Sequence, residues 1–218
     1  MAVLKAPIKV LVVDDHPLLR DGISALIGSQ NDVALCGEAS SGAEALDRYR
    51  ELQPDVTLMD LQMPVMNGFD ALVAIRSEFA EARIIVLTNY RGDVPARALL
   101  RAGASGYLLK SGVRGQLLDA IRKVHDGGTY VQSEILEDFE QHPVSEHLSR
   151  REIAIMRMVA QGLTNKEIAK GIGVSTETVK VALKNVFFKL DANDRTQAAI
   201  TAARRGFLEL STLERPEA

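Results

Sequence analysis

The stretch Asp55-Val-Thr-Leu-Met-Asp-Leu-Gln-Met-Pro-Val-Met-Asn-Gly-Phe-Asp70 decides how the first half of this chain folds. Val56–Met59 is a short apolar run, typical of a strand that is buried on both faces of a sheet. Pro64 and the Asn67-Gly68 pair are turn signals, so Asp60 opens a loop at the carboxyl end of that strand. In open α/β sheets, ligands bind at this end of the strands. The stretch therefore predicts a functional carboxylate at Asp60.

Working outward, strand-like and helix-like segments alternate over about 125 residues, which predicts an α/β doubly wound parallel sheet covered on both faces. Apolar residues recur at helical spacing after each strand, and Ser41-Gly-Ala-Glu44 has the pattern of a capping box. There is no Gly-x-Gly-x-x-Gly and no Walker lysine loop, so a nucleotide site is not expected. The five predicted strands are 8–13, 33–38, 56–59, 83–88 and 106–110, and a helix is predicted over 95–102.

From Leu148 onward the pattern predicts helices alone. Capping boxes start at Ser149 and Thr164, a turn is predicted over 171–174, and Ser175 caps a helix that reaches Leu190. A fourth helix is predicted from Asp194 to about Arg205. Two helices joined by a glycine-containing turn form a helix-turn-helix, a DNA-binding motif. The predicted domains are 1–128, a partly helical linker over 129–147, an all-α four-helix domain over 148–210 and a tail over 211–218.

The charge is distributed unevenly between these parts. Residues 1–145 hold 14 Lys and Arg against 20 Asp and Glu, whereas residues 146–210 hold 11 against 7. A basic second domain favours a polyanionic partner. The single cysteine cannot form an internal disulfide, and no apolar stretch has the length of a membrane span. The chain is therefore predicted to be cytoplasmic, without a membrane partner, and its four histidines are predicted to be surface residues.

Five residues with reactive side chains lie at the ends of four of the predicted strands. Parallel strands end at one edge of a sheet, so these side chains are expected to meet there. Each of them alone has an ordinary explanation, such as a solvated strand end, but together they indicate a site. Clustered carboxylates without soft ligands suit Mg²⁺, and a carboxylate can act as a nucleophile toward phosphorus. The five residues are Asp14, Asp15, Asp60, Thr88 and Lys110.

These residues, with Asp60-Leu-Gln-Met-Pro and Gly106-Tyr-Leu-Leu-Lys110, resemble the receiver domain of two-component response regulators. Leu148-Ser-Arg-Arg-Glu152, Gly162-Leu-Thr-Asn-Lys-Glu-Ile-Ala169, Thr178-Val-Lys180 and Arg195-Thr-Gln-Ala198 resemble the LuxR-type helix-turn-helix. Over nearly its whole length, the chain is thus similar to the NarL/FixJ family. The resemblance implies a flavodoxin-like sheet of five strands in the order 2-1-3-4-5.

The resemblance also implies a set of roles for the first domain. Asp60 accepts a phosphoryl group from a sensor histidine kinase, and Lys110 pairs with that group. Thr88 and Tyr107 act as the switch that relays the phosphorylation state. Mg²⁺ is held by Asp14, Asp15, Asp60 and the backbone carbonyl of Gln62. The chain is not expected to be an enzyme beyond its own phosphoryl transfer to Asp60 and slow autodephosphorylation.

In the predicted recognition helix, Val179, Leu183, Val186 and Leu190 form an apolar stripe that we interpret as core. The opposite side carries lysines, and in a basic helix-turn-helix domain this side favours major-groove contact. The residues expected to contact DNA are Thr164, Asn165, Ser175, Thr176, Thr178, Lys180, Val181, Lys184 and Asn185. Phe188 departs from the polar residue that is more usual at its position in the family.

The sequence therefore predicts a phosphorylation-controlled transcriptional regulator that binds double-stranded DNA half-sites as a homodimer, with RNA polymerase as a further partner. Two alternatives stay open at this stage. One is a DNA-binding regulator that does not depend on phosphorylation and uses its first domain only to dimerise. The other is a Mg²⁺-dependent phosphohydrolase that works through an aspartyl phosphate, although no general base or substrate pocket is evident for it.

Overall fold

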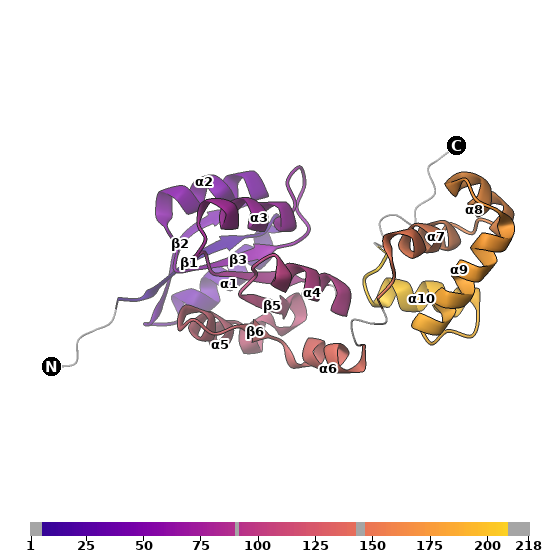
Figure 1. The fold of residues 1–218 in the computed structure, drawn as a ribbon. Coiled ribbons are helices and arrows are strands. Elements are labelled where there is room, and N and C mark those ends of the chain that lie inside the picture. Colours follow the sequence, from indigo (N-terminus) through magenta and orange to yellow (C-terminus); the bar gives the residue numbers. More distant parts are fainter. Residues whose placement is uncertain (1–5, 90–91, 143–146, 209–218) are drawn as a thin grey trace. The chain divides into compact units, whose positions relative to one another are not determined.

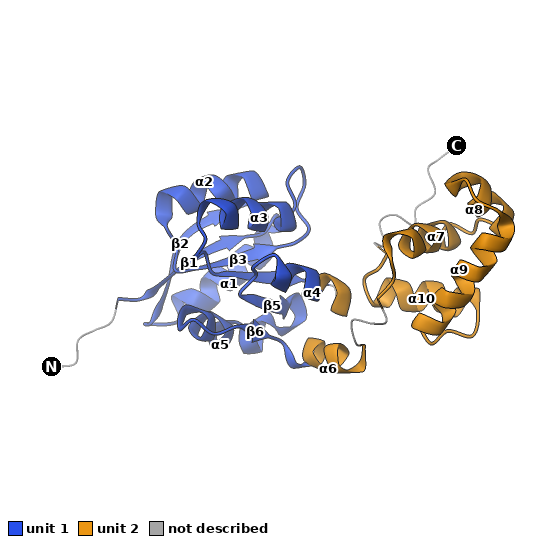
Figure 2. Cartoon of the chain, viewed as in Figure 1, with its two compact units in different colours: residues 1–90, 96–133 blue, residues 91–95, 134–218 orange. Residues whose placement is uncertain are grey.

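The computed structural model describes residues 6–89, 92–142 and 147–208. The chain divides into two compact units (Figure 2). Unit 1 contains residues 1–90 and 96–133, and unit 2 contains residues 91–95 and 134–218. The predicted domain boundaries remain predictions, and the predicted tail over 211–218 lies outside the described residues.

Unit 1 is a parallel sheet of six strands in the order β2-β1-β3-β4-β5-β6. Helices α1 and α5 cover one face, and α2 and α3 cover the other (Figure 1). The strands are β1 (Ile8–Val13), β2 (Val33–Ala39), β3 (Val56–Asp60), β4 (Ile84–Thr88), β5 (Gly106–Leu109) and β6 (Tyr130–Val131). The helices are α1 (Pro17–Gly28), α2 (Gly42–Leu52), α3 (Gly68–Glu78) and α5 (Val113–His125), with a 3₁₀ turn, η1 (Lys110–Gly112), before α5. Helix α4 (Asp93–Arg101) has its first residues, 93–95, in unit 2 and the rest in unit 1.

The predicted fold class is confirmed, and the central strands are fully buried as their unbroken apolar runs predicted. Three local details differ from the predictions. The sheet has a sixth strand, β6, inside the segment predicted as a linker. Lys110 begins η1 instead of ending a strand. The carboxylate of Glu44 accepts from the backbone of Ser40 instead of closing the predicted capping box.

Unit 2 contains a helical bundle of α7 (Arg150–Ala160), α8 (Asn165–Ile172), α9 (Thr176–Lys189) and α10 (Arg195–Arg204). Both predicted capping boxes, at Ser149 and Thr164, are present with reciprocal hydrogen bonds. The predicted turn over 171–174 starts later, because α8 continues to Ile172 and ends at Gly173 in the left-handed conformation. A further helix, α6 (Ser133–Gln141), lies in the segment predicted as a linker.

The core of unit 2 forms where the apolar stripes of these helices meet. The four residues predicted as the core stripe of the recognition helix, Val179, Leu183, Val186 and Leu190, are all buried. This burial fixes the orientation of α9, because the opposite side of the helix must then face outward. Within the described part of the chain, no helix has the length and apolar character needed to cross a membrane.

Candidate functional site

The carboxyl ends of the strands of unit 1 converge on a single ammonium group. Lys110 Nζ lies 2.8 Å from Asp14 Oδ2 and 2.8 Å from Asp60 Oδ2. Asp14 follows β1, Asp60 ends β3, and Lys110 follows β5. Both aspartates are almost completely inaccessible to solvent: Asp14 is 0% exposed and Asp60 is 1% exposed. The structure thus brings together the carboxylates and the lysine that the sequence predicted at this edge.

Burial and the contacts within this pocket shift the pKa values of Asp60 and Lys110. Burial raises the pKa of the Asp60 carboxyl above its ordinary value, despite the opposing hydrogen bond from Lys110. Burial alone would lower the pKa of Lys110, but its hydrogen bonds to Asp14 and Asp60 outweigh that effect and raise it. Lys110 is therefore held as a cation, and the pocket keeps an excess of negative charge.

The loop after β3 holds the Asp60 carboxylate in place at the end of the strand. The backbone N–H of Gln62 donates to Asp60 Oδ1 at 3.2 Å. Gly68, the first residue of α3, packs directly on the end of β3, and a Cβ atom there would lie 1.9 Å from the Asp60 carbonyl oxygen. Only glycine fits this approach. Asn67 caps α3 by accepting from the N–H of Asp70 at 2.9 Å.

Thr88 and Tyr107 are side by side on β4 and β5. Thr88 ends β4 and is 1% exposed, and its side chain hydrogen-bonds to the fully buried Tyr107. Burial raises the pKa of the Tyr107 hydroxyl, so this group stays protonated. A hydroxyl pair of this kind links the rim that carries Asp60 to the interior of unit 1.

Two residues near this pocket were not identified from the sequence. Arg20 on α1 donates to the backbone oxygen of Asp14 at 2.6 Å and to Glu38 at 3.2 Å, which ties the end of β1 to β2. His16 is largely exposed, as predicted, but its ring faces the carboxylates of Asp14 and Asp15. The only sequence signal for His16 was its position directly after the aspartate pair.

In unit 2, the outward side of α9 carries the predicted DNA-contacting residues. Lys180, Val181, Lys184 and Asn185 are exposed, and Phe188 is also exposed, at 89%. The hydroxyls of Thr164 and Ser175 cap α8 and α9, and the hydroxyl of Thr178 hydrogen-bonds to that of Ser175. These capping bonds fix the helix N-termini, whose free N–H groups favour anions.

A shallow hollow of about 300 Å³ lies beside this side of α9 and is lined by residues of α8, α9 and α10. Arg195 at the start of α10 enters it, donates to Asn165 Oδ1 at 3.3 Å and also donates to the backbone oxygen of Leu163. Sequence reasoning placed Arg195 in a family motif without a role. In the structure, the guanidinium of Arg195 adds positive charge to the face of α9 that holds Lys180 and Lys184.

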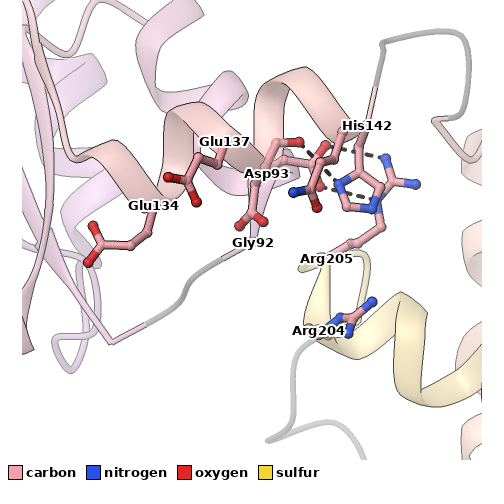
Figure 3. A pocket seen from close by; sticks show the side chains of 9 residues that line it. Gly92, Asp93, Glu134, Glu137, His142, Arg204 and Arg205 are labelled. Atoms are coloured by element: carbon pink, nitrogen blue, oxygen red, sulfur yellow. Dashed lines mark hydrogen bonds and ion pairs between the residues drawn. The ribbon is translucent and has the colours of Figure 1, made fainter.

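A buried ion pair holds residues 92–95 within unit 2. Arg205 donates from Nε to Asp93 Oδ1 at 3.1 Å and from Nη2 to Asp93 Oδ2 at 3.3 Å, beside a cavity of about 360 Å³ (Figure 3). A Cβ atom on Gly92 would lie 2.4 Å from the backbone oxygen of Arg205, so this approach needs glycine. His147 is 20% exposed, lies 3.4 Å from Asp93 and packs edge-on against Phe207, so its prediction as a surface residue was wrong.

The fold and these two sites define a response regulator with an N-terminal receiver domain and a C-terminal LuxR-type DNA-binding domain. The response regulator receiver domain family matches residues 10–122, and the luxR family of bacterial regulatory proteins matches residues 146–202. The chain belongs to the NarL/FixJ family of two-component response regulators, whose members are transcriptional regulators and not classical enzymes.

Characterised relatives are similar over nearly the whole chain. The transcriptional regulatory protein LiaR of Bacillus subtilis is 38% identical over 90% of this chain and 97% of its own length. The response regulator protein VraR of Staphylococcus aureus is 35% identical over 93% of this chain and 99% of its own. The solved structure of RcsB from Salmonella typhimurium is 25% identical over 90% of this chain and 99% of its own, with a TM-score of 0.72.

Proposed function

We propose that Asp60 accepts a phosphoryl group from a sensor histidine kinase and that this modification controls sequence-specific DNA binding through α9. The observation that carries the proposal is the pairing of Lys110 with two buried carboxylates at one edge of the sheet. A buried carboxylate beside a fixed cation can act as a nucleophile toward phosphorus, and the cation can neutralise the charge on the transferred group.

In the transfer, a carboxylate oxygen of Asp60 attacks the phosphorus of a phosphohistidine. The new O–P bond forms as the P–N bond breaks, and the released imidazole nitrogen of the kinase takes up a proton. Lys110 stabilises the negative charge on the phosphoryl oxygens, and Thr88 offers a hydroxyl to the new group. The Thr88–Tyr107 hydrogen bond then connects the modified rim to the interior of the domain. The chain catalyses only this transfer and the slow hydrolysis of its own acyl phosphate.

The donor set fits a hard divalent cation. Lys110 pairs with Asp14 and Asp60, and the carboxylate of Asp15 lies in the same cluster, which leaves an excess of negative charge. These carboxylates and the backbone carbonyl of Gln62 are the oxygen ligands that Mg²⁺ prefers. When bound, Mg²⁺ supplies positive charge that reduces repulsion between the carboxylate and the incoming phosphoryl group.

For the second domain, we propose that Lys180, Val181 and Lys184 contact base edges in the major groove, while Asn165, Thr176, Asn185 and the helix N-termini contact the DNA backbone. The solved structure of RcsB from Salmonella typhimurium concerns its interaction with DNA, which supports DNA as the partner of this domain. Two copies bind paired half-sites as a homodimer, and RNA polymerase is a further partner at the promoter.

One experiment tests both phosphorylation of Asp60 and its effect on DNA binding. Full-length protein is treated with acetyl phosphate and Mg²⁺, phosphorylation is measured by intact mass, and binding to a labelled operator selected from randomised DNA is measured by anisotropy. We expect one phosphoryl group and a gain in operator affinity for the wild type and for the control Asp47→Asn, whose side chain is 78% exposed. Asp60→Asn should show neither.

Each half of the proposal can fail separately. Phosphorylation without any gain in affinity would contradict the regulatory link and favour a receiver that serves for dimerisation alone. Phosphorylation of Asp60→Asn to the wild-type extent would contradict the assignment of the acceptor. Repeated turnover of acetyl phosphate, many times the protein concentration, would favour the phosphohydrolase.

A further inference from the structure

The backbone holds the imidazole of His16 against the acidic pocket. His16 is the N-cap residue of α1, and Pro17 after it restricts His16 to the extended conformation that it adopts. The N–H of His16 donates to Asp14 Oδ1 at 2.9 Å. With the backbone fixed in this way, Nδ1 of the ring lies 2.8 Å from Asp15 Oδ1 and 3.2 Å from Asp14 Oδ1.

These contacts place four candidate ligand atoms together. Asp14, Asp15, His16 and Asp60 each offer one such atom, and among the described residues these atoms all lie within 4.8 Å of one another. A simple ion pair on the surface would explain contact with one carboxylate. It does not explain a ring that faces two carboxylates, one of them fully buried, at the position where the pocket opens to solvent.

We infer that His16 is a protein ligand of the divalent cation in this pocket, and that its imidazole adds more affinity for borderline cations such as Co²⁺ and Zn²⁺ than for Mg²⁺. The inference rests on the proposed function, because it concerns the cation of that same site. Carboxylates and carbonyls suit Mg²⁺ and Mn²⁺, whereas imidazole adds affinity for Co²⁺, Ni²⁺ and Zn²⁺.

The inference makes His16 a specificity residue for the metal. Asp15 and Asp60 contribute oxygen ligands that every divalent cation accepts, so their loss would weaken all metals together. Loss of the imidazole would weaken binding in the order of affinity for nitrogen, with the largest effect on Zn²⁺ and Co²⁺ and the smallest on Mg²⁺. Selective weakening of Zn²⁺ and Co²⁺ binding would show that His16 binds the metal. A residue that only supports the loop would affect the binding of all metals equally.

The direct test is pulsed electron paramagnetic resonance of the full-length protein loaded with Mn²⁺, which detects a ¹⁴N nucleus bound to the metal. We expect ¹⁴N modulation in the wild type and in the control His125→Gln, whose histidine ends α5 and pairs with the next residue, Asp126. The modulation should be absent in His16→Gln. Modulation that is absent from the wild type, or retained in His16→Gln, would overturn the inference.

Affinities give a second readout that does not depend on activity. Competition titrations of His16→Gln should show Co²⁺ and Zn²⁺ binding weakened by about tenfold or more, the scale on which residues around a metal affect affinity. Mg²⁺ binding should change far less. Equal weakening of all three metals, with unchanged circular dichroism, would mean that His16 only supports the loop.

The failure of this inference can be distinguished from failure of the proposed function. Phosphorylation of the wild type by acetyl phosphate with Mg²⁺ tests Asp60 alone. If the wild type accepts no phosphoryl group, the proposed function fails, and the ¹⁴N signal still decides whether His16 binds metal.

Discussion

At the scale of single residues, Lys110 decides the charge balance of the acidic pocket. Its Nζ atom contacts two buried carboxylates, and its own side chain is only 12% exposed. We predict that Lys110→Met lowers the free energy of unfolding of unit 1 by about 3 kcal/mol, because it leaves buried carboxylates without a cation. Added Mg²⁺ should restore more stability to this variant than it adds to the wild type.

Calorimetry with and without Mg²⁺ measures both effects. The matched control is Lys123→Met, since the ammonium group of Lys123 makes a cation–π contact with Tyr130 at 5.8 Å. That variant should lose no more than about 1 kcal/mol and should respond to Mg²⁺ as the wild type does. Equal losses in the two variants would contradict a special role for Lys110.

The ionised carboxylate of Asp60 should lower the free energy of unfolding of unit 1, because it is buried. Its pKa in the folded chain is raised above the ordinary 3.8, chiefly by burial, so the folded state binds the proton more tightly than the unfolded state. As the pH rises from 3.8 through the raised pKa, the folded state must release that proton and stability falls. In metal-free buffer, Asp60→Asn should therefore melt at a higher temperature than the wild type at pH 7.

The difference in Tm between these two proteins should shrink toward zero as the pH falls below 3.8. Thermal melts from pH 3.5 to 7.5 in the presence of a chelator provide the measurement. A variant that melts below the wild type at neutral pH would mean that the ion pair with Lys110 outweighs the cost of burial.

At the scale of elements, the junction of β3 and α3 positions the acceptor. A Cβ atom at Gly68 would overlap the Asp60 carbonyl oxygen, whereas a Cβ atom at Gly22, exposed in the middle of α1, would meet nothing within 4 Å. We predict that Gly68→Ala costs more than about 3 kcal/mol, since α3 must move off the strand end. Gly22→Ala should stabilise the protein by about 0.5–1 kcal/mol.

Denaturant unfolding of the two alanine variants gives these numbers, and intact mass after acetyl phosphate treatment shows whether Asp60 stays competent. Phosphorylation should fall in Gly68→Ala and be unchanged in Gly22→Ala. A Gly68→Ala variant as stable as the wild type would refute the close packing.

In unit 2, Glu152 connects the start of α7 to the end of α9. Its carboxylate accepts from Lys189 Nζ at 2.7 Å and from the N–H of Ser149 at 2.7 Å. Burial would raise the pKa of Glu152, but these hydrogen bonds outweigh it and lower the pKa below the ordinary 4.5. The stabilisation is therefore complete above pH 4.5 and is lost as the pH falls through the lowered pKa.

We predict that Glu152→Gln destabilises unit 2 by about 1–2 kcal/mol at pH 7 and that this deficit disappears at low pH. Melts of both proteins between pH 2.5 and 7 test the prediction. Glu177→Gln is the control, since Glu177 is 74% exposed and pairs with Lys180 on its own helix. A deficit that persists at the lowest pH would contradict a charge effect.

The sequence predicts features that depend on one helix or strand alone, and it does not predict contacts between elements. The buried run before Asp60 and the stripe through Val179 and Leu183 predicted their strand and helix, because periodicity reports burial directly. β6 has two residues, Tyr130 and Val131, too few for any period, and it forms only because the edge of β5 pairs with it. The direction of His16 and the entry of Arg195 into the α9 face depend on tertiary placement.

At the scale of the whole molecule, charge is segregated between the acidic receiver and the basic helical domain. The first 145 residues carry six more acidic than basic groups, and residues 146–210 carry four more basic than acidic. DNA should therefore be attracted to one domain only, and the phosphoryl group adds negative charge to the other. The affinity for DNA must come from a small number of cations on and around α9.

We therefore predict that Lys184→Ala weakens operator binding by the phosphorylated full-length protein by about 1–3 kcal/mol, the cost of losing one base contact. Binding to random DNA should stay within twofold of the wild type. Lys170→Ala, on the exposed end of α8, should leave the preference for operator unchanged. Anisotropy titrations at several salt concentrations distinguish the two kinds of contact. If Lys184→Ala weakens both DNAs equally and reduces the salt slope by about 1, Lys184 binds a phosphate and sequence is read by other residues of α9.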